Sequence, residues 1–243
     1  MRPIFPLTPH FYKLPNRSTT KLVVNLRDSD TDSFVNPGLE ANADVLSIHG
    51  SMQWHDMLHY EEELAKIIEP YCKDYHRIIL IGICKTSIPL FRAIVNLLDK
   101  TSDCNFGLLV NAMPYDYDNG TSPVDPKHGF EISPRIRDID PEDLPILKDY
   151  GGMDLLCKKY ENKLSLSPRF RLFNFLGFDD RYIVFDWVNR NRVRNYETLH
   201  FEYDVSQFTG ATNEKVHAFL IILSKFRPQQ VTAIFRRCFE TLN

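Results

Sequence analysis

The chain has 243 residues, of which 43% are hydrophobic and 12% aromatic, enough to bury one large core without a second domain. Its formal net charge is only -3, with basic and acidic residues mixed along the sequence, so non-specific attraction to nucleic acid or anionic lipid is not expected. The first ten residues are broken by prolines and no apolar run approaches about eighteen residues, so we expect no signal peptide and no membrane span.

Cysteine usage indicates the compartment. The five cysteines form no C-x-x-C pair, and their odd number in apolar surroundings fits a reducing environment better than a disulfide framework. They stand at positions 72, 84, 104, 157 and 238. We therefore expect a cytoplasmic protein with a single domain over residues 1–243.

The first third of the chain predicts short strands and one helix. Its proline-rich start leaves room for no more than an edge strand around 11–14. Apolar runs predict strands at 21–26 and 44–48. Apolar residues at helical spacing from Met57 to Ile68 predict an amphipathic helix, which Pro70 should end.

The middle of the chain alternates strand and helix and then loses this rhythm. A strand is predicted at 77–82, a helix at about 87–99 and a strand at 106–112. Residues 113–169 hold several prolines and glycines and predict an irregular, partly helical insertion. Over the carboxyl end of a strand, such an insertion would form a lid.

The alternation then resumes to the end of the chain. Strands are predicted at 171–177 and 199–205, and helices at about 180–194, 213–226 and 229–242. Strands that alternate with helices of this length favour parallel pairing. The predicted fold class is therefore α/β, a mostly parallel sheet flanked by helices.

Reactive residues follow three of the predicted strands. The stretch R-I-I-L-I-G-I-C-K-T-S, residues 77–87, is typical of a buried strand turning sharply into a helix, with Cys84 at the apex. Asp179 and Asp180 follow the strand at 171–177, and a polar loop follows the strand at 199–205. Ligands bind beyond the carboxyl ends of parallel strands. A nucleophile, then an acid, then a loop that should supply histidine is the chain order of the α/β-hydrolase triad.

The surroundings of Cys84 suit nucleophilic chemistry. A helix N-terminus and the adjacent Lys85 both favour the thiolate form. The backbone N–H of Lys85 would be one oxyanion donor, and a second would come from the loop near Arg27 or Asp28. Thr86 stands where a glycine normally follows the nucleophile. The alternative is that Cys84 is simply a small buried residue closing the turn.

Three short motifs resemble those of α/β-hydrolase-fold enzymes of bacterial surface polysaccharide biosynthesis, notably capsular polysaccharide O-acetyltransferases. They are G-I-C-K-T-S at 82–87, G-F-D-D-R-Y at 177–182 and T-G-A-T-N-E at 209–214. The resemblance implies an α/β-hydrolase fold and an O-acetyltransferase or esterase acting on a glycan or a small acylated substrate. Acetyl-CoA would be the acyl donor of a transferase.

Carried over onto this sequence, the resemblance makes Cys84 the nucleophile and Asp180, or Asp179, the acid. Ala211 stands where the catalytic histidine is expected, and an alanine cannot move the proton. Three explanations compete. Residue 211 is histidine in the native protein and this chain is an inactivated variant; the protein is a natural pseudoenzyme; or another histidine acts as the base. The retained T-G and T-N-E favour a recent or deliberate change. The nearest substitute, His217, borders an apolar helix face.

Other residues have weaker functional interpretations. Trp54 and Tyr115 are candidate substrate contacts, although an aromatic such as Trp54 is as often part of a core. A basic run would contact an anionic ligand or, more simply, form a solvated helix face; it consists of Arg190, Arg192 and Arg194.

A metal site and a binding role are the competing interpretations. His55 and His59 have the i, i+4 spacing of a zinc helix, but no third ligand is evident, so we favour a helix start and no metal. Ala211 and the missing glycine at position 86 favour a noncatalytic hydrolase-fold binding module as the alternative to an enzyme.

Overall fold

The computed structural model describes residues 3–15, 18–28, 42–111, 159–160, 168–177, 197–204 and 219–242. Several predicted features lie outside these residues. They are Tyr115, Asp179, Asp180, Ala211, His217, the basic run at 190–194, the helix at 180–194 and most of the insertion at 113–169.

A seven-stranded sheet organises the described chain, in the order β1-β3-β2-β4-β5-β6-β7. The strands are β1 (Thr8–Tyr12), β2 (Lys21–Asp28), β3 (Asp44–Gly50), β4 (Arg77–Ile83), β5 (Asn105–Asn111), β6 (Phe170–Gly177) and β7 (Glu197–Tyr203). Strands β2 to β7 pair in parallel, and β1 pairs antiparallel with β3 at one edge. The mostly parallel sheet is thereby confirmed.

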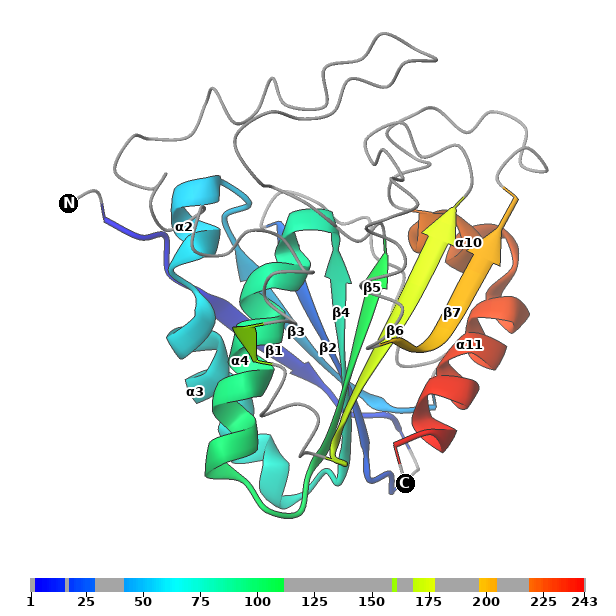
Figure 1. The fold of residues 1–243 in the computed structure, drawn as a ribbon, viewed down its shortest axis with the longest axis horizontal. Coiled ribbons are helices and arrows are strands. Elements are labelled where there is room, and N and C mark those ends of the chain that lie inside the picture. The colour runs from blue at the N-terminus through cyan, green and yellow to red at the C-terminus, as the bar shows by residue number, and fades with distance from the viewer. Residues whose placement is uncertain are drawn as a thin grey trace, which may run out of the picture.

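Helices cover both faces of this sheet (Figure 1). One face carries α2 (Trp54–Leu58), α3 (Glu61–Ile68) and α4 (Ser87–Lys100), while α10 (Phe219–Phe226) and α11 (Pro228–Glu240) lie on the other. Two short 3-10 helices complete the described elements, η1 (Glu69–Lys73) and η2 (Cys84–Thr86). Among the described helices, none is long and apolar enough to cross a membrane.

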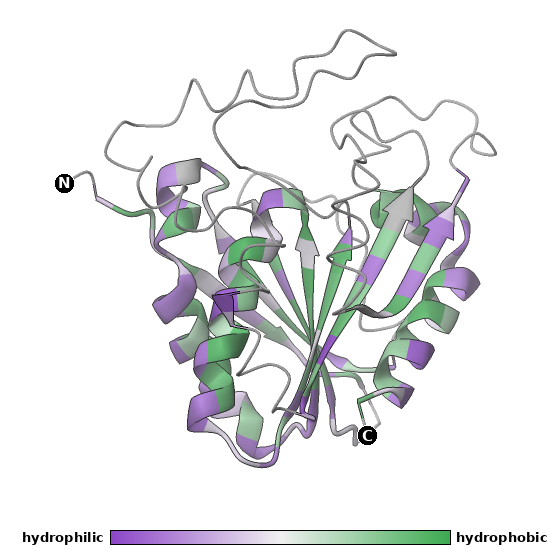
Figure 2. Cartoon of the chain, in the orientation of Figure 1, coloured by the Kyte–Doolittle hydropathy of each residue, from purple (hydrophilic) through white to green (hydrophobic). Residues whose placement is uncertain are grey.

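The central strands are buried on both faces, which explains their unbroken apolar sequences. In β4, Ile78 and Leu80 join the core beneath α3 and α4, whereas Ile79 and Ile81 join the core beneath α10 and α11. Because alternate residues of a strand point to opposite faces, a strand covered on both sides needs apolar residues throughout. The helices are hydrophobic toward the sheet and hydrophilic on the outside (Figure 2).

Two predicted elements differ in the structure. The edge strand is β1 at 8–12 rather than 11–14, and every one of its residues is exposed, so no apolar pattern marks it. The helix predicted from Met57 to Ile68 is two helices, α2 and α3, which meet at Tyr60. The Tyr60 ring is fully buried, and its hydroxyl accepts the Ser51 N–H at 2.9 Å, a long-range contact that helical spacing cannot reveal. The α-helix does end at Ile68, as predicted, and Pro70 stands in the first turn of the 3-10 helix η1 that follows.

Candidate active site

Residues 82–87, here called the elbow, make the turn from β4 into α4. Strand β4 ends at Ile83, η2 begins at Cys84, and α4 begins at Ser87. Cys84 has a φ of 49°, one of two positive values among the described non-glycine residues. This left-handed conformation costs about 1–2 kcal/mol for a residue with a side chain. The strand therefore turns abruptly into the helix with Cys84 at the apex, as predicted.

Gly82 makes the sharpness of the turn possible. A Cβ atom at this position would lie 2.6 Å from Ser87 Cα and 2.8 Å from Ser87 Cβ. Such distances are well inside van der Waals contact, and the nearest of these atoms belongs to the backbone of α4. Only a glycine allows the first turn of α4 to fold back so closely onto the end of β4.

Two hydroxyl groups bind the backbone of the elbow. Thr86 Oγ1 accepts the Ile83 N–H at 2.8 Å and donates to the Ile83 carbonyl oxygen at 3.0 Å. Ser87 Oγ donates to the Cys84 carbonyl oxygen at 2.5 Å. The sequence-based reasoning missed both roles. The available signal was the pair of short hydroxyl residues at a helix start, where such side chains often bind nearby backbone groups.

Lys85 links the elbow to a second loop. Its Nζ donates to the Met52 carbonyl oxygen at 2.5 Å, in the loop between β3 and α2. That loop is itself held, since Ser51 N–H donates to the buried hydroxyl of Tyr60. The Lys85 side chain thus braces the turn, whereas the role of its backbone N–H as an oxyanion donor stays a prediction.

Strand β2 lies directly beside β4, which suits the predicted second oxyanion donor. The two strands pair in parallel as far as Asn25 and Ile81. Arg27 lies two residues beyond this pair and Asp28 ends β2, so both are at the same edge of the sheet as the elbow. The loop that continues from Asp28, residues 29–41, lies outside the described residues.

Strands β6 and β7, which precede the expected acid and histidine loops in the sequence, end at this edge. Ile83 of β4 is in register with Asn111 of β5, which is in register with Phe175 of β6, and Phe175 with Phe201 of β7. The four strands therefore end at the same edge of the sheet, with β6 and β7 extending two residues beyond the ends of β4 and β5. The chain leaves β6 toward Asp179 and Asp180, and it leaves β7 toward residue 211.

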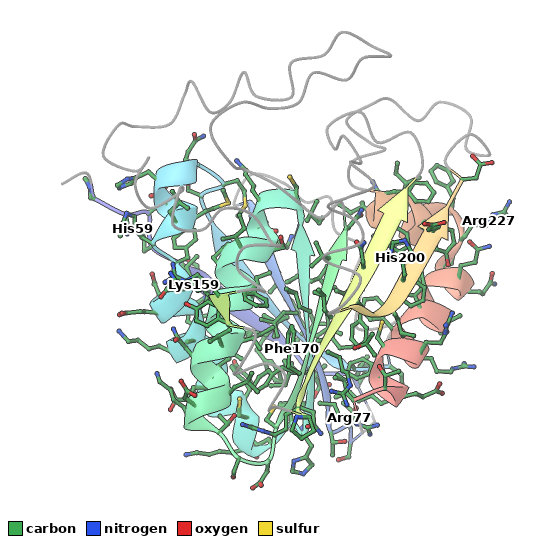
Figure 3. All side chains as sticks on the ribbon, in the orientation of Figure 1. His59, Arg77, Lys159, Phe170, His200 and Arg227 are labelled. Carbon is green, nitrogen blue, oxygen red and sulfur yellow. The ribbon has the colours of Figure 1, made fainter. Side chains whose placement is uncertain are left out.

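His200 is a described histidine on this side of the sheet, and it is too far from the elbow to act there. It shares a register row with Gly82, three strands away, a separation of about 14 Å. Its Nε2 lies 2.9 Å from Glu202 Oε1, and its Nδ1 lies 3.3 Å from Asn174 Nδ2. Figure 3 shows it on β7, well above Arg77 at the amino end of β4. A base that takes the proton of Cys84 directly must lie within hydrogen-bond distance of the thiol. His200 therefore cannot be that base.

The two histidines with zinc-helix spacing do not share a helix. His55 lies within α2 and is buried, whereas His59 follows the helix as its C-cap. Their ring centroids are 5.2 Å apart. Within the described part of the chain, no group of three His, Cys, Asp or Glu side chains is placed to hold a metal ion. Trp54 is the first residue of α2.

Some buried polar side chains in the described sheet have atoms without a hydrogen-bond partner, and three of them matter here. They are Asn25 Oδ1, Ser47 Oγ and Asn111 Nδ2. Asn111 ends β5, and its Oδ1 accepts the Leu220 N–H at 2.9 Å, which ties α10 to this strand end. Buried polar groups are nearly always paired, and exceptions gather at functional sites. Asn25 lies beside the last part of β4, so the unpaired atoms extend toward the elbow.

Comparisons with known proteins identify the architecture. No protein-family model matches the chain, and no curated protein is detectably similar to it. Solved structures do match. An esterase from Pyrobaculum calidifontis is 13% identical over 97% of this chain and 86% of its own, with a TM-score of 0.53. A thermostable carboxyl esterase from Bacillus coagulans is 11% identical over 96% and 94%, with a TM-score of 0.52. An α/β hydrolase from the metagenome of Lake Arreo is 11% identical over 96% and 79%, with a TM-score of 0.55.

The chain has the α/β-hydrolase fold. The predicted fold class is confirmed. At such low identity the likeness concerns the fold alone. The finer resemblance to capsular polysaccharide O-acetyltransferases stays a prediction.

Proposed function

We propose that the protein is an acyl-transfer enzyme whose nucleophile is Cys84. The observation that carries this proposal is the elbow, in which Cys84 adopts a positive φ at the end of β4 and Gly82 alone allows the turn. A strained residue that the surrounding structure holds in place is typical of functional sites. The α/β-hydrolase fold and the common edge at which β4 to β7 end support the same assignment.

The reaction would proceed through a thioester. The Cys84 thiolate attacks the carbonyl carbon of an ester or thioester substrate, and the negative charge moves onto the carbonyl oxygen. The Lys85 N–H and a donor from the loop after β2 would bind that oxyanion. The alcohol or thiol leaves with a proton from the general acid, which would be the histidine expected at position 211. Water or a sugar hydroxyl then attacks the thioester, loses its proton to the same group and releases the Cys84 thiolate. Water makes the enzyme an esterase, and a sugar hydroxyl makes it a transferase.

The substrate proposal comes from the motif resemblance. It makes a surface polysaccharide or related glycan the acceptor, and acetyl-CoA the donor if the enzyme is a transferase. Asp180 would orient the catalytic histidine, and Trp54 and Tyr115 would contact the substrate. These assignments depend on the three motifs at 82–87, 177–182 and 209–214.

Ala211 decides between two versions of the function. With histidine at position 211 the triad would be complete, whereas with alanine the proton transfers lose their carrier and the rate should fall by several orders of magnitude. The second candidate, a noncatalytic binding module, is favoured by this residue. His217 follows in the chain as the remaining substitute base.

Acylation of the thiol tests the proposal. The protein and its Ala211→His, Cys84→Ala and His217→Ala variants are incubated with p-nitrophenyl acetate or with acetyl-CoA, and intact mass and nitrophenol release are followed. We expect one added acetyl group that the Cys84→Ala variant lacks, and sustained turnover in the Ala211→His variant. Absence of an adduct on Cys84 in both the unmodified chain and the Ala211→His variant would contradict the proposal. No turnover in Ala211→His, together with calorimetric binding of an acetylated oligosaccharide, would favour the binding module.

A further inference from the structure

Thr86 occupies the position at which the nucleophile motif of this fold, G-x-S-x-G, has its second glycine. A larger residue there is expected to crowd the turn. The structure shows instead that the Thr86 side chain is buried, with 7% of its surface exposed, and turned back onto the strand that precedes Cys84. Threonine in place of the motif's second glycine therefore adds contacts to the elbow.

The Thr86 hydroxyl binds both polar groups of one residue. It accepts the Ile83 N–H and donates its own proton to the Ile83 carbonyl oxygen. Ile83 is extended, with φ −113° and ψ 117°, whereas Cys84 has a φ of 49°, so these bonds hold the chain where its direction changes. The β-branched threonine has few χ1 rotamers, which makes it a stiff anchor. The peptide group on the amino side of Cys84 is fixed in this way.

Ser87 fixes the peptide group on the other side. Its hydroxyl donates to the Cys84 carbonyl oxygen at 2.5 Å, in addition to the Ser87 backbone N–H, which donates to the same oxygen, and Ser87 is itself fully buried. Because a peptide group is planar, holding the Cys84 carbonyl oxygen also sets the direction of the Lys85 N–H. That N–H is the oxyanion donor of the proposed mechanism. The two hydroxyls therefore hold the two peptide groups that flank the nucleophile.

We propose that Thr86 and Ser87 are positioning residues for the acyl-transfer reaction: Thr86 sets the direction in which Cys84 presents its thiol, and Ser87 aims the Lys85 N–H at the oxyanion. This inference rests on the proposed function. A purely structural role, as for many Ser and Thr side chains at helix starts, would change the stability of the fold and leave the thiol chemistry of the folded protein unaltered.

Two reactions of the same thiol separate the two roles. Alkylation by iodoacetamide needs a correctly placed thiolate but builds no oxyanion, whereas acylation by p-nitrophenyl acetate needs both. Both rates are measured at Cys84 by peptide mass spectrometry over a range of pH, with thermal unfolding as the measure of stability. The variants are Thr86→Val, which keeps the shape and removes the hydroxyl, Thr86→Ser, which keeps the hydroxyl, and Ser87→Ala.

We expect Thr86→Val to slow both reactions about tenfold or more, because both hydrogen bonds of the hydroxyl are lost, and Thr86→Ser to stay within about twofold of the wild type. Ser87→Ala should slow acylation about tenfold or more and leave alkylation within about twofold. If Thr86→Val does not fold, Thr86→Gly restores the glycine of the motif and makes the same comparison.

Three results would overturn the proposal or part of it. A folded Thr86→Val protein with unchanged alkylation reduces Thr86 to a structural residue. Equal slowing of both reactions in Ser87→Ala removes its role toward the oxyanion. If the wild-type chain forms no acyl adduct, the role of Ser87 fails together with the proposed function, whereas the alkylation rates still decide the role of Thr86.

Discussion

The two ends of the parallel sheet are built differently. At the amino end, buried polar groups are hydrogen-bonded. The Asp44 carboxylate accepts the Tyr75 hydroxyl at 2.6 Å and the Leu14 N–H at 2.7 Å. The Arg169 guanidinium, just before β6, donates to carbonyl oxygens that end α4 and precede β5, those of Leu98, Thr101 and Cys104. This end ties loops and helix ends to the sheet.

The carboxyl end holds strain and unpaired atoms instead. Cys84 has a positive φ there, and Gly82 has a neighbour so close that no side chain fits. Asn25 and Asn111, in strands next to β4, each have a buried polar atom without a partner among the described residues. Strain and unsatisfied groups lower stability and persist where function requires them. The difference agrees with the proposal that the carboxyl end carries the chemistry, whereas the hydrogen bonds at the amino end stabilise the fold.

The described cysteines follow the same division. Cys72 and Cys104 lie at the amino end, buried, with their thiols donating to the carbonyl oxygens of Ile68 and Asn105. Hydrogen bonding to Cys72 together with burial raises the pKa of the Cys104 thiol. Cys84, at the other end, is partly exposed. All of these residues are cysteines, so residue type cannot single one out. What distinguishes Cys84 as a candidate nucleophile is its partly exposed position in the fold.

The largest effect is expected from Gly82→Ala, which disrupts the elbow at the carboxyl end of the sheet. The added Cβ would clash with the Ser87 backbone, so the free energy of unfolding should fall by about 3 kcal/mol or more. Alkylation of Cys84 should also fall by at least about tenfold, because the elbow cannot close. Urea unfolding and peptide mass spectrometry measure the two effects.

Gly107→Ala is the matched control in the neighbouring strand β5. Its Cβ would lie 2.5 Å from Phe173 Cε2, a side-chain contact in the core. It should destabilise the protein by about 1–3 kcal/mol without altering the alkylation rate of Cys84. Equal Cys84 rates in the two variants would show that the elbow has no special part in presenting the thiol.

Tyr75→Phe tests the hydrogen bonding at the amino end of the sheet. The variant removes a buried hydrogen bond to the Asp44 carboxylate, which should lower the free energy of unfolding by about 1.5–3 kcal/mol. The alkylation rate of Cys84 should not change, since the substitution lies at the opposite end of the strands. Urea unfolding monitored by fluorescence measures the stability. A selective loss of Cys84 reactivity would contradict the division between the two ends.

The contribution of Tyr75 should also depend on pH. Burial and the hydrogen bond to Asp44 raise the pKa of the Tyr75 hydroxyl above its ordinary value. Folding therefore favours the protonated form, and the stability it contributes is fully present below about pH 10 and declines as the pH rises further. The stability gap between the wild type and Tyr75→Phe should narrow above about pH 10. Unfolding free energies at a series of alkaline pH values measure it, and a constant gap would refute the assignment.

Asn25→Leu should have the smallest effect. Asn25 is 3% exposed and its Oδ1 has no partner within the described residues, so an apolar side chain of similar shape should leave stability within about 1 kcal/mol of the wild type or raise it. Asn105→Leu is the matched control at the amino end. It removes the bond from Asn105 Nδ2 to the Leu242 carbonyl oxygen and should cost about 0.5–1.5 kcal/mol. A larger loss of unfolding free energy in Asn25→Leu than in Asn105→Leu would contradict the view that the amino end of the sheet is the stabilising one.

Much of the sheet is predictable from the sequence for a physical reason. Strands β4 and β5 are covered on both faces, so their apolar runs mark them to within about a residue. Strand β1 is exposed and carries no such mark. The break between α2 and α3 escaped prediction because Tyr60 continues the apolar face of a helix while its hydroxyl binds Ser51.

For the candidate site, the sequence alone determined that Gly82 lies at the end of a buried strand and that Cys84 stands between this strand and a helix, a pattern that local chemistry explains. The tertiary structure decided what surrounds them. The place of β2 beside β4 arises from long-range strand pairing, which no local pattern specifies. The hydrogen bonds of Thr86 and Ser87 were likewise decided by the folded turn, because a hydroxyl at a helix start can bind any of several nearby backbone groups and the sequence does not say which.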